Sequence, residues 1–177
     1  MKLPPSFLRH ALVSGSAASV LSTFTLAGLG RRESAGSAAP INAISHWVHG
    51  DRAYRRDRPD LRHTGLGLAI HQASALLWGV LYEALLGLRV ASRAESGPRR
   101  ATPARPVSLA AARRPPIDEL VGLAAGVTAL AAFTDLRLVP PRLSPGFEHR
   151  LRPASVGLVY LAFCGGLALG AALSRRA

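Results

Sequence analysis

Residues 65–88 read "GLGLAIHQASALLWGVLYEALLGL", a stretch that contains no lysine or arginine. About 20 mostly apolar residues in a helix suffice to cross the hydrocarbon core of a bilayer. Apolar side chains such as Val80, Leu81 and Leu85 point to all sides of a helix here, whereas a helix of a soluble bundle keeps one polar face. The stretch therefore predicts a membrane-spanning helix.

Three more apolar stretches lie outward from this one, at residues 11–30, 118–137 and 154–173. With 49% hydrophobic residues in 177, the chain has the size of one domain. The third stretch is the shortest, because its unbroken apolar run reaches full length only by carrying Asp135 toward the interface. The sequence predicts an all-α fold, an integral membrane four-helix bundle in a single domain, residues 1–177.

The first stretch has an alternative interpretation as a secretory signal, since Lys2 and Arg9 precede it and small residues follow. Its apolar run is longer than the roughly 7–15 residues of a signal core. Arg31 and Arg32 also stand between the run and the small residues. We therefore expect the first helix to remain in the protein.

The chain is strongly basic, with a formal net charge of +12 and Lys2 as its only lysine. Nucleic acid is the obvious partner for such a charge, but the arginines lie in the connections between spans, without interleaved aromatic residues. Arginines in this position contact lipid phosphates. The expected partners are the lipid bilayer and anionic lipid headgroups, and no nucleic acid.

The number of basic residues does not decide the orientation, because they are equally numerous on the two sides of the predicted bundle. Four spans place both termini and the loop 89–116 on one side, and the loop 31–64 on the other. The loop 89–116 is rich in arginine and proline, as a flexible linker beside an anionic inner leaflet would be. We expect a multi-pass membrane protein with both termini in the cytoplasm.

The loop 31–64 contains a predicted interfacial helix at about residues 40–49, with proline at its start and glycine just beyond it. Trp47 and the neighbouring aliphatic residues share one face, directed toward lipid or the bundle. Ser45, His46 and His49 share the other face. Asp60 is expected to cap the first turn of the second span.

Both loops that follow odd-numbered spans must lie at the same membrane face. This topology collects a set of ionisable side chains at one end of the bundle: His46, His49, His71, Asp135 and His149. His71 and Asp135 are the most informative, because they fall inside or at the edge of apolar spans, where such groups are costly. His71 also begins a polar stripe with Ser74, Trp78 and Tyr82, which is expected to face other helices.

Three interpretations of this set remain open. Its members can form interhelical hydrogen bonds and interfacial anchors. His46 and His49, three residues apart on one helical face, can instead begin a metal or proton site used in transport or sensing. Haem would require a histidine on each of two spans, and only His71 qualifies. We expect no cofactor.

Small residues mark the third and fourth spans, which carry the GxxxG pairs Gly122 with Gly126 and Gly166 with Gly170. Such pairs permit close helix contact, so we expect these two spans to pack on each other or across a homo-oligomer. The single cysteine, Cys164, is interpreted as a packing residue. Glu83 is expected to reach the interface at the opposite end.

Three segments carry a resemblance to a known family: "HQASALLWGVLY" at 71–82, "GLAAG" at 122–126 and "LVPPRLSPGFE" at 138–148. They resemble small uncharacterised bacterial inner-membrane proteins of the YagU-like kind, over spans two to four. This chain departs from that pattern in its arginine-rich middle loop and in the loop before span two. The resemblance implies this architecture and a location in the bacterial inner membrane, and no chemistry.

No nucleophile elbow, phosphate loop or HExxH pair occurs in the chain. We therefore expect a small polytopic membrane protein with a structural, interaction or accessory role.

Overall fold

A computed structural model of the protein describes residues 6–96 and 114–176. Within these ranges all the regular secondary structure is helical, and there is no strand. The long helices are α1 (Ser6–Glu33), α4 (Leu66–Ser96), α5 (Ile117–Phe133) and α6 (Pro153–Ser174). Single π-helical turns, η2 (Leu61–Gly65) and η4 (Thr134–Leu138), extend α4 at its start and α5 at its end.

Four segments are long and apolar enough to cross a membrane: Ser6–Glu33, Leu61–Arg93, Ile117–Leu138 and Pro153–Ser174. Their outward faces carry large apolar side chains, and Phe24 is 72% exposed, as expected where lipid replaces water. The predicted class and the four spans are confirmed, and the protein is an all-helical, multi-pass membrane protein. Most of the predicted loop 89–116, namely residues 97–113, lies outside the described ranges.

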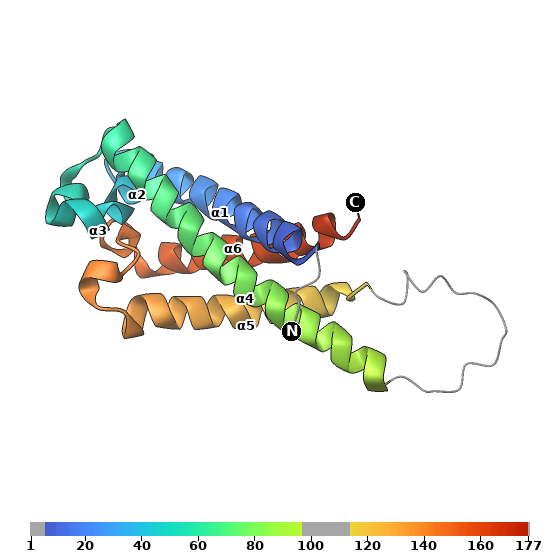
Figure 1. The fold of residues 1–177 in the computed structure, drawn as a ribbon. Helices are drawn as coiled ribbons and strands as arrows, with labels where there is room; N and C mark the ends of the chain where they lie inside the picture. Colours follow the sequence, from blue (N-terminus) through green and yellow to red (C-terminus); the bar gives the residue numbers. More distant parts are fainter. Residues whose placement is uncertain (1–5, 97–113, 177) are drawn as a thin grey trace, which may run out of the picture.

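Helix α1 packs along α6 on one side and α4 on the other, and α5 packs on α6 and α4 (Figure 1). The contact is close because small residues meet there. A Cβ placed on Gly170 would lie 2.5 Å from the Cα of Ser14, and one on Gly79 would lie 2.8 Å from the Cα of Gly15. Gly166 lies equally tightly against Ala18. The first helix is thus an integral part of the bundle.

The glycine pairs of spans three and four differ in their surroundings. A Cβ placed on Gly122 or Gly126 would meet no atom within 4 Å, so this pair forms no close helix contact within the described chain. The pair on α6 packs against α1 rather than against α5. Spans three and four therefore do not contact each other through their glycines, contrary to expectation. The glycines of α6 pack against small residues of α1 instead.

The loop after α1 and the loop after α5 pack together at the end of the bundle opposite the start of α1 and the end of α6 (Figure 1). The first contains α2 (Ala39–Ile44), α3 (His46–His49) and η1 (Gly50–Arg55), and the second contains η5 (Pro141–Leu143) and η6 (Phe147–His149). All six residues of α2 are buried. Gly146 turns the second loop with a φ of 86° against the carbonyl of Ala43, a conformation that favours glycine.

The predicted interfacial helix therefore needs a correction. It is divided at Ser45 into two short helices, and α2 is inserted into the end of the bundle instead of lying on its surface. Ser45 and His46, expected on the outward face, are 0% and 4% exposed. The reason is tertiary, because the second odd loop covers the side that the sequence pattern assigned to water.

Candidate functional site

A cavity of about 220 Å³ lies between the four long helices and the packed loops. Its walls are largely apolar, and aromatic rings form much of them: Trp47, Trp78, Phe147, Tyr160 and Phe163. Polar groups reach it from three helices and from η4: Ser22, His71, Ser74, Tyr160 and Asp135. A mostly apolar pocket with a few convergent polar groups is the usual form of a small-molecule site.

His71 of α4 forms an interhelical hydrogen bond, with 2.8 Å between its Nε2 atom and the Oγ atom of Ser22 on α1. The Ser22 hydroxyl also lies 2.7 Å from the carbonyl oxygen of Ala18. One hydroxyl proton cannot serve both acceptors, so Nε2 is the donor whenever Ser22 donates to its own helix. Among the described residues nothing bonds to Nδ1 of His71, which leaves this atom for a ligand.

Asp135 lies on η4, one turn beyond α5, and accepts a 3.0 Å hydrogen bond from the phenol of Tyr160 on α6. The π-helical turn at Thr134–Leu138 is wider than an α-helical turn, and such turns recur at functional sites. His71 and Asp135 thus line the same cavity, although each has its own hydrogen-bond partner. Tyr160 was not identified from the sequence, although a polar residue within an apolar span could have signalled it.

The loop histidines lie elsewhere, in two groups of rings. His46 stacks on Tyr54 with 5.1 Å between ring centroids, and Tyr54 contacts His149 at 4.8 Å. His49 instead contacts His63, at 4.7 Å. In the part of the chain that the structure describes, no three His, Cys, Asp or Glu side chains are placed to hold a metal ion together. The predicted set is thus divided between the cavity, which His71 and Asp135 line, and the packed loops, which contain His46, His49 and His149.

Hydrogen bonds tie the loops into a fixed roof over the cavity. Trp47 of α3 donates its indole N–H to the carbonyl of Ser144 at 2.8 Å, which joins the first loop to the second. Arg150 binds the carbonyl of Tyr54 and the carboxylate of Asp57. Because the cavity wall includes Trp47 itself, these bonds set the shape of the site before any ligand arrives.

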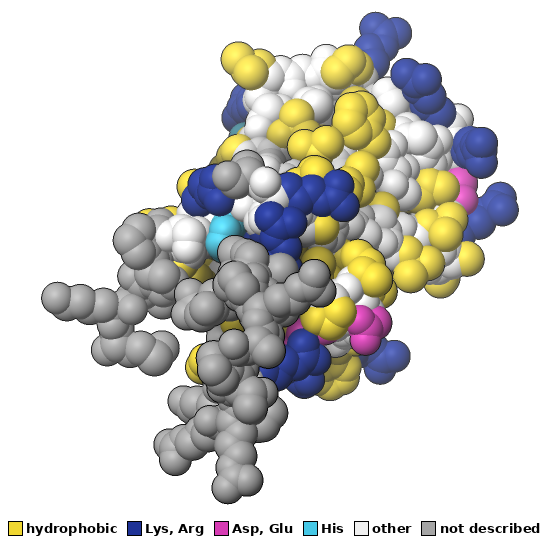
Figure 2. Space-filling model, turned by 90° about the vertical axis from the view of Figure 1, so that its right-hand side faces the viewer, with side chains coloured by type: hydrophobic (Ala, Val, Ile, Leu, Met, Phe, Trp, Pro, Cys, Tyr) yellow, Lys and Arg dark blue, Asp and Glu magenta, His cyan; other side chains and the backbone are white. Residues whose placement is uncertain are grey.

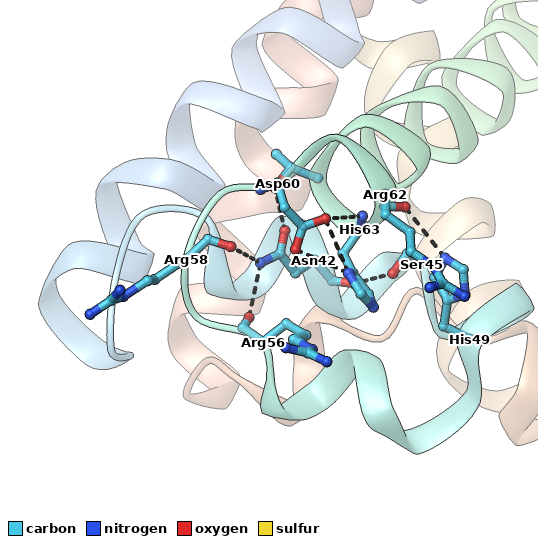
Figure 3. Close-up of polar contacts among 9 residues, drawn as sticks. Asn42, Ser45, His49, Arg56, Arg58, Asp60, Arg62 and His63 are labelled. Carbon is cyan, nitrogen blue, oxygen red and sulfur yellow. Dashed lines mark hydrogen bonds and ion pairs between the residues drawn. The ribbon is translucent and has the colours of Figure 1, made fainter.

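Asn42 of α2 holds the start of the second span (Figure 3). Its amide nitrogen donates to the carbonyls of Arg56 and Arg58 at 2.9 and 3.0 Å, and its oxygen accepts from Thr64 at 2.6 Å. Asp60 caps the first turn through a 2.6 Å bond from the backbone N–H of His63, as predicted. This bond lowers the pKa of Asp60 below its ordinary value, because it stabilises the ionised carboxylate.

A second polar cluster lies at the opposite end. Glu83 of α4 is 3% exposed and forms an ion pair with Arg175, which directly follows the end of α6. Ser14 of α1 donates a 2.6 Å hydrogen bond to the same carboxylate. Glu83 was expected at the interface, so its burial is a correction. The bundle closes around Glu83 because Arg175 and Ser14 satisfy its charge.

Exposed arginines surround that end of the molecule, among them Arg9, Arg93, Arg114 and Arg176. Figure 2 shows basic side chains over this face, with hydrophobic side chains between them. The arrangement suits a membrane interface, where arginine contacts lipid phosphate and apolar groups contact the acyl region.

Comparison with protein-family models, curated proteins and solved structures found no match to this chain.

Proposed function

We propose that this protein is a binding protein of the bacterial inner membrane that holds a small, largely apolar ligand in the cavity at its loop end. The observation that supports this most is the cavity itself. An apolar cavity of about 150 Å³ already holds a benzene molecule, so about 220 Å³ accommodates one substituted ring or a short branched chain. An accessory role, in which the ligand is bound and presented to a membrane partner, fits the expectation from the sequence.

The route into the cavity supports a ligand that arrives through the lipid. Leu77 and Leu143 belong to the cavity wall, and they are 67% and 44% exposed. The wall therefore reaches the outer surface between α4 and the segment after α5. Since apolar surface at this level faces acyl chains, a molecule dissolved in the bilayer can enter sideways.

The Ser22 and His71 pair favours binding over acyl transfer. A serine nucleophile needs a histidine base that is oriented by a third group on its other ring nitrogen. Within the described residues no carboxylate bonds to Nδ1 of His71, and Asp135 is bonded to Tyr160 instead. The pair therefore serves best as a fixed hydrogen-bonding wall.

The orientation of the protein belongs to the same proposal. Both termini lie in the cytoplasm, where anionic lipid meets the arginines around them. The cavity then lies at the outer face of the membrane. A homo-oligomer or a partner subunit can cover the outer side of α5, where Gly122 and Gly126 meet no neighbour.

Tryptophan fluorescence tests binding directly, because the chain has two tryptophans, and both line the cavity. Bromobenzene, a neutral ring that quenches tryptophan on contact, is titrated into the full chain in lipid nanodiscs. We expect saturable quenching of the native protein. Ser74→Phe fills the cavity and should leave only the unsaturable quenching that bromobenzene in lipid produces.

The matched control is Ala73→Phe, which adds the same ring at an exposed position one residue away. It should keep the saturable component. Equal, unsaturable quenching in the native protein and in both variants would show that the cavity binds nothing and would overturn the proposed function.

A further inference from the structure

Asp135 is the only side chain with a formal charge on the cavity wall, among the wall residues that the structure describes. Its single recorded bond is the hydrogen bond from Tyr160. None of the ion pairs among the described residues includes it. A carboxylate at the edge of an apolar cavity without a cation is costly, so its lack of a cationic partner calls for an explanation.

The contrast with the other acidic residues is informative, because the chain has 22 basic residues and only 10 acidic ones. Glu83, Glu119 and Asp57 each form an ion pair with an arginine. The fold thus supplies arginine partners to some acidic side chains, and others that have none among the described residues, such as Asp51 and Asp118, are exposed. The nearest charge that acts on Asp135 is a second carboxylate, that of Glu148 in the loop, which is not part of the cavity wall.

Glu148 strengthens the negative character of this region. Its Oε2 atom is buried and has no hydrogen-bond partner. Its other oxygen is 3.8 Å from His149, which is too long for a hydrogen bond. The single formally charged side chain on the described cavity wall is thus a carboxylate, with a second carboxylate nearby, in a protein whose formal charge is +12.

The aromatic walls favour the same ligand charge. The face of an aromatic ring carries negative electrostatic potential, so rings around a cavity attract cations, most of all weakly hydrated ammonium groups. Trp47, Trp78 and Tyr160 line the cavity together with Asp135. An anion would meet this carboxylate and no arginine or lysine on the described wall.

We propose that the ligand is a cation, namely an ammonium group carried on a small apolar body, and that Asp135 is the residue that selects for its charge. This inference rests on the proposed function and narrows it to a class of ligand. The ammonium lies between the Asp135 carboxylate and the aromatic rings, and the apolar body fills the space beside Ile70 and Val159.

Displacement of bromobenzene from the full chain in nanodiscs tests the charge. The probes are benzyltrimethylammonium and neopentylbenzene, which have the same shape and differ by one positive charge, and phenylmethanesulfonate as the anion. Affinities are compared per mole of probe in the lipid phase. We expect the cation to bind at least ~10-fold more tightly than its neutral isostere, as judged by displacement of bromobenzene. This ratio is typical of one partly desolvated charged contact. The anion should not compete.

Asp135→Asn keeps the shape of the side chain and an acceptor for Tyr160, and should bring the cation to the affinity of the neutral probe. Tyr160→Phe retains the carboxylate and should retain the preference. Asp118→Asn removes an exposed acid at the opposite end of α5, and should change nothing if the effect is local.

This inference would be overturned if the native protein bound the cation and the neutral probe with equal affinity, or if Asp135→Asn left the ratio of the two affinities unchanged. Saturable quenching by bromobenzene in the same experiment would still support the proposed function. Loss of that quenching itself would overturn both. Nanodiscs of phosphatidylglycerol with and without phosphatidylethanolamine distinguish the source of the ammonium. Competition by phosphatidylethanolamine supports a lipid headgroup as the ligand, and its absence supports a free amine.

Discussion

Single buried polar residues hold particular helices of this bundle together, and Glu83 is the clearest case. Its carboxylate joins three helices, since Arg175 directly follows the end of α6 and Ser14 comes from α1. Removing one partner of a buried ion pair destabilises a protein more than replacing both partners with apolar residues, because the remaining charge is left buried without compensation. The effect of a substitution therefore depends on what happens to the partner.

Glu83→Leu is expected to lower the free energy of unfolding by about 3 kcal/mol, because it leaves the Arg175 guanidinium partly buried and unpaired. The double variant Glu83→Leu with Arg175→Leu should recover most of this loss. Thermal and denaturant unfolding in detergent, followed by circular dichroism, measures both. Arg176→Ala, at the exposed neighbouring arginine, is the control. An unaltered melting curve for Glu83→Leu would contradict the role assigned to the pair.

The bond between His71 and Ser22 gives a smaller effect. His71→Leu should lower stability by roughly 1 kcal/mol, the size of an interhelical hydrogen bond in membranes, whereas His71→Gln should keep much of it. Ser22→Ala should match His71→Leu, and combining the two should add little. Fully additive losses in this double-mutant cycle would show that the two side chains act independently.

The loop histidines are expected to bind no metal tightly. The rings of His46 and His149 pack on Tyr54, whereas His49 packs on His63, and a closed zinc site needs four ligands on one ion. Protein purified without a histidine tag should contain no stoichiometric zinc, iron or copper, and a chelator should not change its melting. Metal present in fixed ratio, and lost in the variant His46→Ala with His49→Ala, would establish the transport or sensing alternative.

At the scale of elements, helix α1 organises the others through its small residues. It contacts α4 with Gly15 and α6 with Ser14 and Ala18, so two helices approach it more closely than leucine side chains would allow. Helix α5 has no such contact through its glycines. The GxxxG pairs of α5 and α6 look alike in the sequence, but only substitutions in the α6 pair are expected to destabilise the bundle.

Gly166→Leu and Gly170→Leu should each destabilise the protein by about 1–3 kcal/mol or more, since the added side chain must push α6 away from α1. Gly122→Leu and Gly126→Leu are the matched controls and should leave the melting temperature of the monomer nearly unchanged. Size-exclusion chromatography is run in parallel. A change in oligomer size for Gly126→Leu alone would show that α5 contacts a second copy of the chain.

At the scale of the whole molecule, the topology fixes which segments share a membrane face. The packed loops lie at one end and the chain termini at the other (Figure 1), while the basic residues do not decide which end is cytoplasmic. The arginine-rich connection between α4 and α5 favours the anionic inner leaflet.

A reporter inserted at Pro103 should therefore be cytoplasmic, and one at Arg52 should be outside the membrane. Alkaline phosphatase and green fluorescent protein fusions, active on opposite sides, measure this. Exchange of the two results would reverse the proposed orientation and leave the bundle intact. Two reporters on the same side would contradict the four spans themselves.

The sequence by itself determined the spans and the shared end of His71 and Asp135. Both follow from local length, apolar composition and an even number of crossings, which need no knowledge of neighbours. The cap at Asp60 was predictable for the same reason, since it lies within one turn of the residue it binds.

Only the tertiary structure decided which glycines are in contact, that α2 is buried, and that Arg175 neutralises Glu83. It also brought Ser22, Trp47 and Tyr160 to one cavity with His71 and Asp135. GxxxG pairs arise by chance in a chain rich in alanine and glycine, and the partner of a buried charge comes from a distant segment. A cavity is the space that several packed helices leave unfilled, so it exists only once their distances and rotations are set.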